Sequence, residues 1–296
     1  MQTSIIAAVI YGWLAALLPA SETEPVKKPG VTLRFVTEEN AILPGKPITV
    51  GLFLEHEPEY HTYWKSPGIV GVATRLEWKL PEGFSAGEIQ WPAPQRTKMA
   101  QITAYGYETD TCLISEIHVP DVVAGDKITL KARLGLMCCA ASCHPAWHDM
   151  EITLPVLRDG SKPKRDEKWA KVMAAARAKF PKKAPDSWRF SARRIATEDP
   201  EIHDVEIGLA LPEEAELPDG FDWAKTYFFC HDNQVHSDQP QKISADGKSV
   251  LMNLKGTEFA PKNPEGVSGV LFHPAGWTGL NTKWIEVFVR WPGKKS

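Results

Sequence analysis

The segment from Lys127 to Met137 constrains the fold of this chain more than any other part of the sequence. Every second residue from Ile128 to Leu136 is apolar, whereas Lys127, Lys131 and Arg133 occupy positions between them. A period of two with one charged face is typical of a half-buried strand in an antiparallel sheet. The chain is therefore expected to be built from sheets that each turn one face to a core.

Other short apolar or alternating segments precede this strand, separated by turn signals such as Pro44-Gly45. Proline accounts for 24 of 296 residues, about 8% against the ~5% usual in globular proteins, which favours strands and turns over helices. Residues 30–157 are therefore predicted to form a β-sandwich of immunoglobulin-like size. Met150–Val156 is expected to be its last strand, and Pro145 is expected to keep the residues before it out of a strand.

The pattern changes over residues 158–186, which are expected to link two domains. Asp166 to Phe180 spaces Trp169, Val172, Met173 and Ala176 along one helical stripe, and this stripe is most simply a packing face.

Alternation typical of strands returns after Trp188, so residues 187–296 are expected to form a second β-sandwich. The predicted fold class is all-β, with two immunoglobulin-like β-sandwich domains joined by a short helical linker.

The first twenty residues differ from the rest. Ile5–Leu18 is almost entirely apolar and is followed by Pro19-Ala20 and then a polar segment. This pattern predicts a secretory signal peptide over residues 1–20, although no Lys or Arg precedes the apolar run. An uncleaved membrane anchor is the alternative, but 14 apolar residues are short for a span. After cleavage no stable membrane insertion is expected.

The charge balance excludes one class of partner. Lys and Arg number 34 against 37 Asp and Glu, which gives a net charge of −3. Without a strongly basic surface, nucleic-acid binding is not expected.

Three of the five cysteines, Cys138, Cys139 and Cys143, lie within six residues at the end of the strand described first. A short loop can bring Cys143 within disulfide distance of the strand end. Adjacent residues of an extended chain point to opposite faces, so only one of Cys138 and Cys139 can share a face with Cys143. A bridge that closes so short a loop adds little stability, which favours an exchangeable disulfide. Cys112 and Cys230 are expected to be buried thiols, with a bridge between the two domains as the alternative.

Two other interpretations of the cluster stay open. One is a purely structural disulfide. The other is a copper or zinc site, since thiolates and imidazoles suit these metals and the cluster offers Cys138, Cys139, Cys143, His144 and His148. The spacing does not match a paired Cys-x2-Cys zinc site, so no metal and no other cofactor is expected.

An ordered series of motifs resembles the N-terminal domain of the thiol:disulfide interchange protein DsbD. The series comprises His61-Thr62-Tyr63-Trp64-Lys65-Ser66-Pro67-Gly68, Glu77-Trp78-Lys79-Leu80-Pro81-Glu82-Gly83-Phe84, Ile89-Gln90-Trp91-Pro92-Ala93-Pro94, Tyr105-Gly106-Tyr107-Glu108 and Cys139-x3-Cys143-x-Pro145. The resemblance covers about residues 30–157.

This resemblance implies a periplasmic, immunoglobulin-like domain that passes reducing equivalents by disulfide exchange. Its redox pair corresponds to Cys139 and Cys143, with Cys143 forming the mixed disulfide, and Cys138 leaves an alternative pairing open. The implied partners are thioredoxin-fold oxidoreductases or a membrane electron transporter. Whether such exchange amounts to enzymatic turnover is left open.

The resemblance also implies roles for aromatic residues. Tyr60 and Tyr63 match a segment near the cysteine pair, and Tyr105 and Tyr107 match a loop that caps it, with ordinary core packing as the alternative. His144 adjoins Cys143 and, when protonated, would favour its thiolate. The expected function is thus periplasmic thiol–disulfide exchange. The alternative is an exported binding or interaction module with a structural disulfide that binds copper or zinc.

Overall fold

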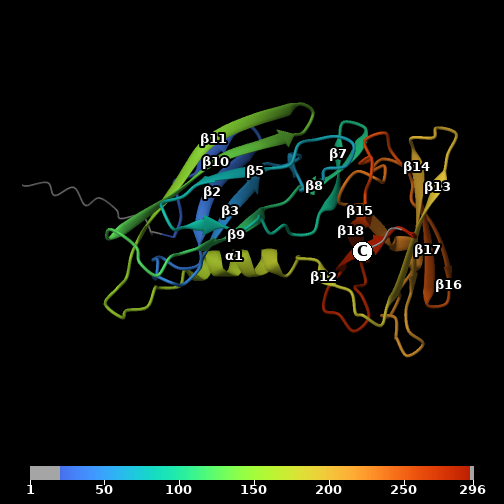
Figure 1. The fold of residues 1–296 in the computed structure, drawn as a ribbon. Coiled ribbons are helices and arrows are strands. Elements are labelled where there is room, and N and C mark those ends of the chain that lie inside the picture. Colours follow the sequence, from blue (N-terminus) through green and yellow to red (C-terminus); the bar gives the residue numbers. More distant parts are fainter. Residues whose placement is uncertain (1–20, 294–296) are drawn as a thin grey trace, which may run out of the picture.

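A computed structural model describes residues 21–293 of the protein, which form two β-sandwiches and one α-helix (Figure 1). The expected signal peptide, residues 1–20, lies outside the described residues. Between residues 21 and 293, no helix combines the length and the apolar character needed to span a bilayer.

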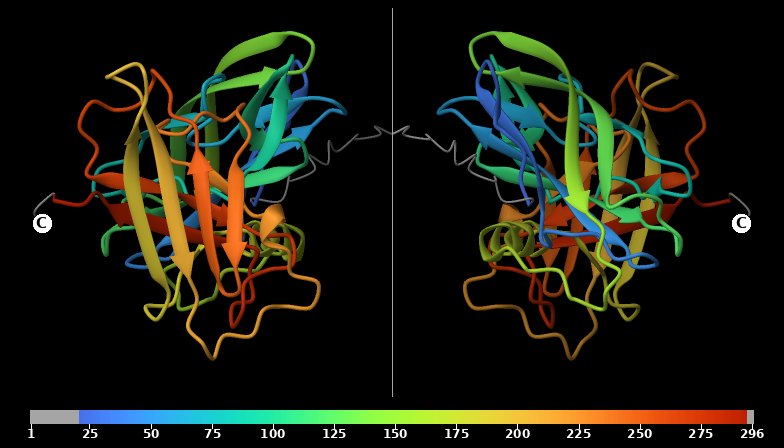
Figure 2. Two further views of the ribbon diagram at one scale, coloured as in Figure 1. Left: turned by 90° about the vertical axis from the view of Figure 1, so that its right-hand side faces the viewer. Right: turned by 90° about the vertical axis from the view of Figure 1, so that its left-hand side faces the viewer.

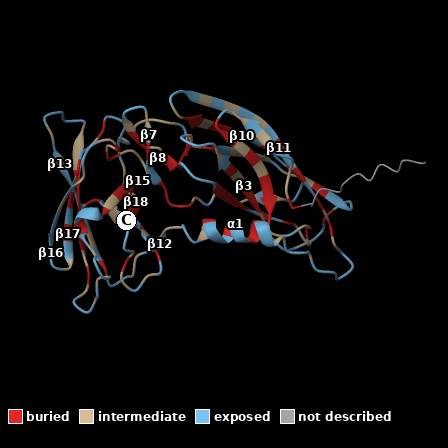
Figure 3. Cartoon of the chain, turned by 180° about the vertical axis from the view of Figure 1, so that it is seen from behind, coloured by how far each residue is buried: buried red, intermediate tan, exposed pale blue. Residues whose placement is uncertain are grey.

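The first sandwich packs two sheets around one apolar core, drawn in red in Figure 3. The first sheet has the order β1 (Val26–Lys28), β2 (Val31–Thr37), β3 (Ile48–His56), β9 (Thr111–His118) and β6 (Ser85–Ala86). The second has the order β11 (Cys143–Pro155), β10 (Lys127–Cys139), β4 (His61–Tyr63), β8 (Ile102–Tyr107) and β7 (Gln95–Met99), with β5 (Arg75–Lys79) also paired to β10. The strand predicted from alternation, Lys127–Met137, is β10 without its last two residues, and its apolar face lies in the core.

The long hairpin of β10 and β11 differs from the sequence prediction. The strand expected at Met150–Val156 begins at Cys143, so β11 is 13 residues long and includes Pro145. β11 is an edge strand, where half of the backbone N–H groups point away from the sheet and a proline can be accommodated. The prediction that Pro145 would exclude this segment from a strand was wrong for that reason.

The helix α1 (Glu167–Arg177) begins where the sequence predicts. The Asp166 carboxylate accepts hydrogen bonds from the backbone N–H groups of Lys168 and Trp169, which caps the helix. Its apolar stripe packs on the outer face of the first sheet, against a cluster that includes Cys112 (Figures 1 and 3). The helix therefore lies in the connection between the sandwiches and also covers the first one.

The second sandwich also consists of two sheets around its own core. One sheet has the order β12 (Lys182–Lys183), β19 (Trp284–Arg290), β18 (Gly266–Phe272) and β15 (Tyr227–Cys230). The other has the order β13 (Arg189–Ala196), β14 (His203–Ala210), β17 (Ser249–Leu254) and β16 (Lys242–Asp246), and the short 3-10 helix η1 (Trp223–Lys225) precedes β15. The prediction of an all-β fold with two sandwiches is confirmed.

Candidate functional site

Cys139 and Cys143 form a disulfide bond at the end of the β10–β11 hairpin. They are the last register pair of the two strands, their Cα atoms are 4.1 Å apart, and residues 140–142 connect them. The hairpin turn lies at the upper edge of the molecule, toward the second sandwich (Figures 1 and 2). The expected pairing is therefore present at the end of a hairpin.

The two halves of the bridge differ in accessibility. Cys139 has an exposed fraction of 0%, whereas Cys143 is exposed. A disulfide is opened by a thiolate that must reach one of its sulfur atoms. An incoming partner therefore meets Cys143 first, and Cys139 is the natural leaving group.

Cys138 does not take part in this bridge. Its side chain lies on the opposite face of β10, in the core of the first sandwich, and its thiol is free. Burial, together with the negative charge of Glu57, raises the pKa of this thiol to about 12. Cys138 is therefore a protonated, packed thiol and is not the partner of Cys143.

The aromatic residues singled out by the resemblance lie on both faces of the sheet. Tyr63 packs with Ala104 and Cys139 in a small buried cluster, against which Val70 and Met137 also pack. Tyr105 and Tyr107 belong instead to the main core, on the face that contains Cys138.

Tyr107 donates a hydrogen bond to the Pro92 carbonyl at 2.6 Å, and Tyr105 packs edge-on against Phe229 of the second sandwich. Neither ring belongs to the buried cluster of Cys139, against which Val70 and Met137 pack.

Tyr60 and His144 lie together beside the hairpin turn. Their ring centroids are 6.2 Å apart, and His144 Nε2 is 3.0 Å from the Ser142 hydroxyl within the turn. Both side chains are half-buried. The structure thus brings Tyr60 and His144 to the exposed half of the disulfide and Tyr63 to its buried half.

His61 is a site residue that the sequence analysis missed. It is the cross-strand neighbour of Cys139 in the β10–β4 register, and its Nε2 lies 3.2 Å from the Tyr63 hydroxyl oxygen. Burial lowers the pKa of His61, while Glu108 opposes that shift, and burial raises the pKa of Tyr63 to about 12. Both side chains are therefore neutral at pH 7. The signal in the sequence was their period of two, which places His61 and Tyr63 on one face.

The exposed face of β11 carries a large apolar side chain, Trp147, a short distance along the strand from the disulfide. Cys143, Pro145 and Trp147 alternate with less exposed residues, and Trp147 is 57% exposed. The Trp147 ring lies over Gly135, where any Cβ would overlap it. An exposed tryptophan therefore stands four residues from the accessible sulfur, on the same face.

Comparison with known proteins gives a family match for the first sandwich. Residues 32–155 match the family model described as "Thiol:disulfide interchange protein DsbD, N-terminal". The match covers nearly the whole of the first sandwich. No curated protein matches the chain.

Among solved structures, the fold is similar to the N-terminal periplasmic domain of ScsB from Proteus mirabilis. The identity is 18% and the TM-score 0.61, and the match covers 91% of this chain and 98% of that chain. The likeness therefore extends over both sandwiches. A yeast GGA1 GAE domain (10% identity, TM-score 0.26, covering 43% of this chain and 93% of that one) and a conserved domain protein from Bacillus anthracis (11%, 0.27, 86% and 80%) are similar at a lower level.

The five side chains considered as metal ligands at the hairpin end do not form a metal site. Cys139 and Cys143 are bonded to each other, and Cys138 lies on the other face of the strand. Across residues 21–293, no group of three or more His, Cys, Asp or Glu side chains is arranged to hold a metal ion.

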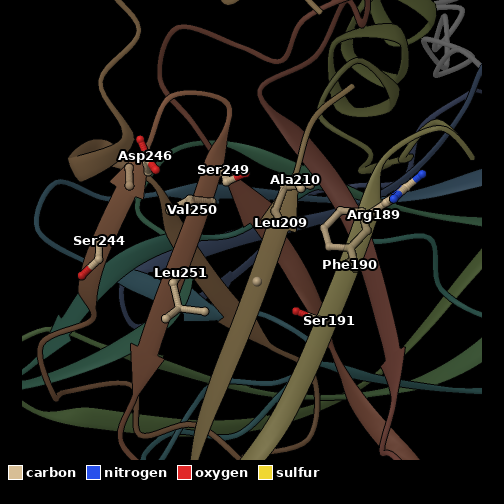
Figure 4. Close-up of a pocket in the computed structure, with 12 residues that line it drawn as sticks. Arg189, Phe190, Ser191, Leu209, Ala210, Ser244, Asp246, Ser249, Val250 and Leu251 are labelled. Atoms are coloured by element: carbon tan, nitrogen blue, oxygen red, sulfur yellow. The ribbon is translucent and has the colours of Figure 1, made fainter. Parts of the chain in front are cut away.

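A hollow on the outer face of the second sandwich has a different character. It lies over β13, β14, β17 and β16, with a volume of about 470 Å³, and Phe190 and Leu251 line it (Figure 4). Its lining contains no cysteine and no histidine, so it offers no group for thiol chemistry.

Proposed function

We propose that the protein exchanges disulfides with thioredoxin-fold partners through Cys139 and Cys143. The observation that carries this proposal is the unequal exposure of the two halves of one disulfide at the tip of a hairpin. The match of residues 32–155 to the DsbD N-terminal family model supports the same chemistry. An accessible sulfur is what thiol–disulfide exchange requires.

The exchange proceeds through one mixed disulfide. A thiolate of the partner attacks Cys143 Sγ, a new S–S bond forms, and the Cys139–Cys143 bond breaks, so that Cys139 leaves as a thiolate and takes up a proton. The partner's second thiol then attacks the mixed disulfide and releases Cys143, which is also protonated. Two electrons and two protons move from the partner's dithiol to this pair, and the reverse steps pass them to an oxidised acceptor.

His61, positioned by Tyr63, transfers the proton to and from the buried sulfur of Cys139. A thiolate at Cys139 would be poorly solvated, and burial disfavours the charged form. His61 lies across the strand from Cys139 and is hydrogen-bonded to Tyr63. Its neutral ring can accept the thiol proton when the bridge forms and release it to water, and it can relay a proton from water to the Cys139 thiolate when the bridge opens.

The proposal includes a location and an electron source. We assign residues 1–20 to an export signal and the folded chain to the periplasm, where DsbD N-terminal domains act. The partner that supplies or removes electrons is a thioredoxin-fold oxidoreductase or a membrane electron transporter.

The test is to incubate the oxidised protein with a reduced thioredoxin-fold protein and follow two signals. Thiol alkylation and peptide mass mapping report whether Cys139–Cys143 has opened, and circular dichroism reports the fold. The proposal predicts that the bridge opens while the β-sheet signal is unchanged. A bridge that stays closed, or a fold that melts as it opens, would instead identify a structural disulfide.

A further inference from the structure

The segment between β4 and β5, residues 64–74, lies over the buried half of the disulfide and is called here the cover segment. Val70 packs against the cluster of Tyr63, Ala104 and Cys139. The neighbouring Gly71 approaches the Tyr63 ring so closely that any Cβ would overlap it. The position of this segment therefore decides how well the Cys139 side of the bridge is covered.

A buried hydroxyl group links the middle of the cover segment to the second sandwich, and the Trp64 ring at its start packs against His231, with ring centroids 5.2 Å apart. Ser237 accepts a hydrogen bond from the Ile69 backbone N–H at 3.2 Å and donates one to the Thr103 carbonyl at 2.7 Å. Gly68 has a φ of +86° and packs on Ser237, leaving no room for a Cβ. Ser237 thus joins the cover segment to β8, the strand that carries Ala104.

The loop that carries Ser237 is itself firmly placed. Asp238 accepts a hydrogen bond from the Thr103 backbone N–H at 2.8 Å, and the Tyr227 hydroxyl donates one to the Ser237 carbonyl at 3.2 Å. The Tyr105 ring packs against Phe229 with centroids 4.9 Å apart. The Asp238 and Phe229 contacts join residues more than a hundred positions apart and fix the Ser237 loop against β8. The cover segment is also hydrogen-bonded to β8, since the Tyr105 backbone N–H donates to the Pro67 carbonyl at 2.8 Å. It is therefore held from two sides, by β8 before Gly68 and by the second domain at Ile69.

We propose that the second domain controls the reactivity of the Cys139–Cys143 disulfide by holding the cover segment in place, with Ser237 as the positioning residue. This inference rests on the proposed function, to which it adds a role for the second sandwich. With the Ser237 contacts intact, Cys139 stays covered and only Cys143 is open to attack. When these contacts loosen, Val70 moves off the cluster and the bridge opens more readily.

The test measures the rate at which dithiothreitol reduces the disulfide of the full-length protein. One dithiothreitol becomes a cyclic disulfide for each bridge converted to two thiols. Ser237→Ala should raise this rate by about fivefold, the factor expected for losing roughly one net hydrogen bond from the covered state. Deuterium exchange of the Ile69 amide should rise in parallel.

The matched control is Ser115→Ala, which removes a hydroxyl group from another buried serine. The Ser115 Oγ has no hydrogen-bond partner within residues 21–293, and Ser115 lies on β9 in the other sheet of the first sandwich. This variant should be reduced at the wild-type rate. Gly68→Ala, which presses on Ser237 from the first domain, should accelerate reduction as Ser237→Ala does.

Reduction of Ser237→Ala and Gly68→Ala at the wild-type rate would overturn the inference, as would an equal acceleration in Ser115→Ala. Because dithiothreitol takes the place of the protein partner, this outcome is independent of the test of the proposed function. A protein that does not exchange with thioredoxin-fold partners can still be reduced faster by dithiothreitol when Ser237 is replaced. Equally, a protein that does exchange with such partners can be reduced at the same rate with and without Ser237.

Discussion

Replacing Trp169 by alanine should destabilise the first domain by about 3–5 kcal/mol, the usual cost of removing a buried aromatic side chain from a core. Trp169 is 1% exposed and packs edge-on against Phe53, with ring centroids 5.2 Å apart. Its indole Nε1 has no hydrogen-bond partner among the described residues, so the cost arises from lost packing and the cavity left behind. The prediction tests whether α1 belongs to the first folding unit, which would then extend beyond residue 157.

The Cys112 thiol, which lies in the same cluster under α1, provides the assay. Burial raises the pKa of this thiol to about 12, so in the native state it is protonated and protected from alkylation. Labelling by iodoacetamide then reports how often the helix or the domain opens, and peptide mass mapping separates Cys112 from the other free thiols. At 1.36 kcal/mol per decade, the expected destabilisation accelerates labelling by between about a hundredfold and several thousandfold.

Trp147→Ala is the matched control, because Trp147 is 57% exposed on β11. Its removal should cost about 1–2 kcal/mol, since more than half of its surface stays in water on folding. If Trp169→Ala labels Cys112 no faster than Trp147→Ala does, the helix is not part of the first domain's core.

Three further outcomes follow from the site. His61→Phe should slow reduction of the bridge by about tenfold or more and flatten its pH dependence if His61 carries the proton, and an unchanged pH–rate profile would contradict this role. His56 and His231 each have a pKa of about 4, lowered mainly by burial from 6.5, so both are neutral in the fold. Because the unfolded chain binds these protons more readily, the free energy of unfolding should be highest above pH 6.5 and fall by up to ~3 kcal/mol per histidine as the pH drops to 4. Urea unfolding at several pH values would measure this fall. Trp147→Ala should weaken binding of the partner by about tenfold in calorimetry, because the ring shares the exposed face of Cys143, and unchanged affinity would remove it from the docking surface.

The sequence predicts well those features that depend on local periodicity. The alternation through β10 places Cys138 and Cys139 on opposite faces, as the structure has them. The helix begins after Asp166, whose side chain is a strong capping group at that position. Both results need only the rise and twist of a single element.

Features that depend on neighbours distant in the sequence were not predictable in this way. Whether a proline such as Pro145 can lie in a strand depends on β11 being at a sheet edge. The faces of Tyr105 and Tyr107 relative to Cys139 depend on the register of β8 with β4, which no local pattern encodes. Ser237 reaches the cover segment across 168 positions of sequence, so nothing near it signals this contact.

The central claim is that Cys143 is the sulfur that meets the partner, and trapping of mixed disulfides tests it most directly. Cys139→Ala removes the resolving thiol, so the Cys143 thiolate should attack an oxidised thioredoxin-fold protein and remain bonded to it in a complex that survives non-reducing electrophoresis. Cys143→Ala should accumulate no such complex, because the remaining Cys139 is fully buried. Trapping by Cys143→Ala, with none by Cys139→Ala, would contradict the account.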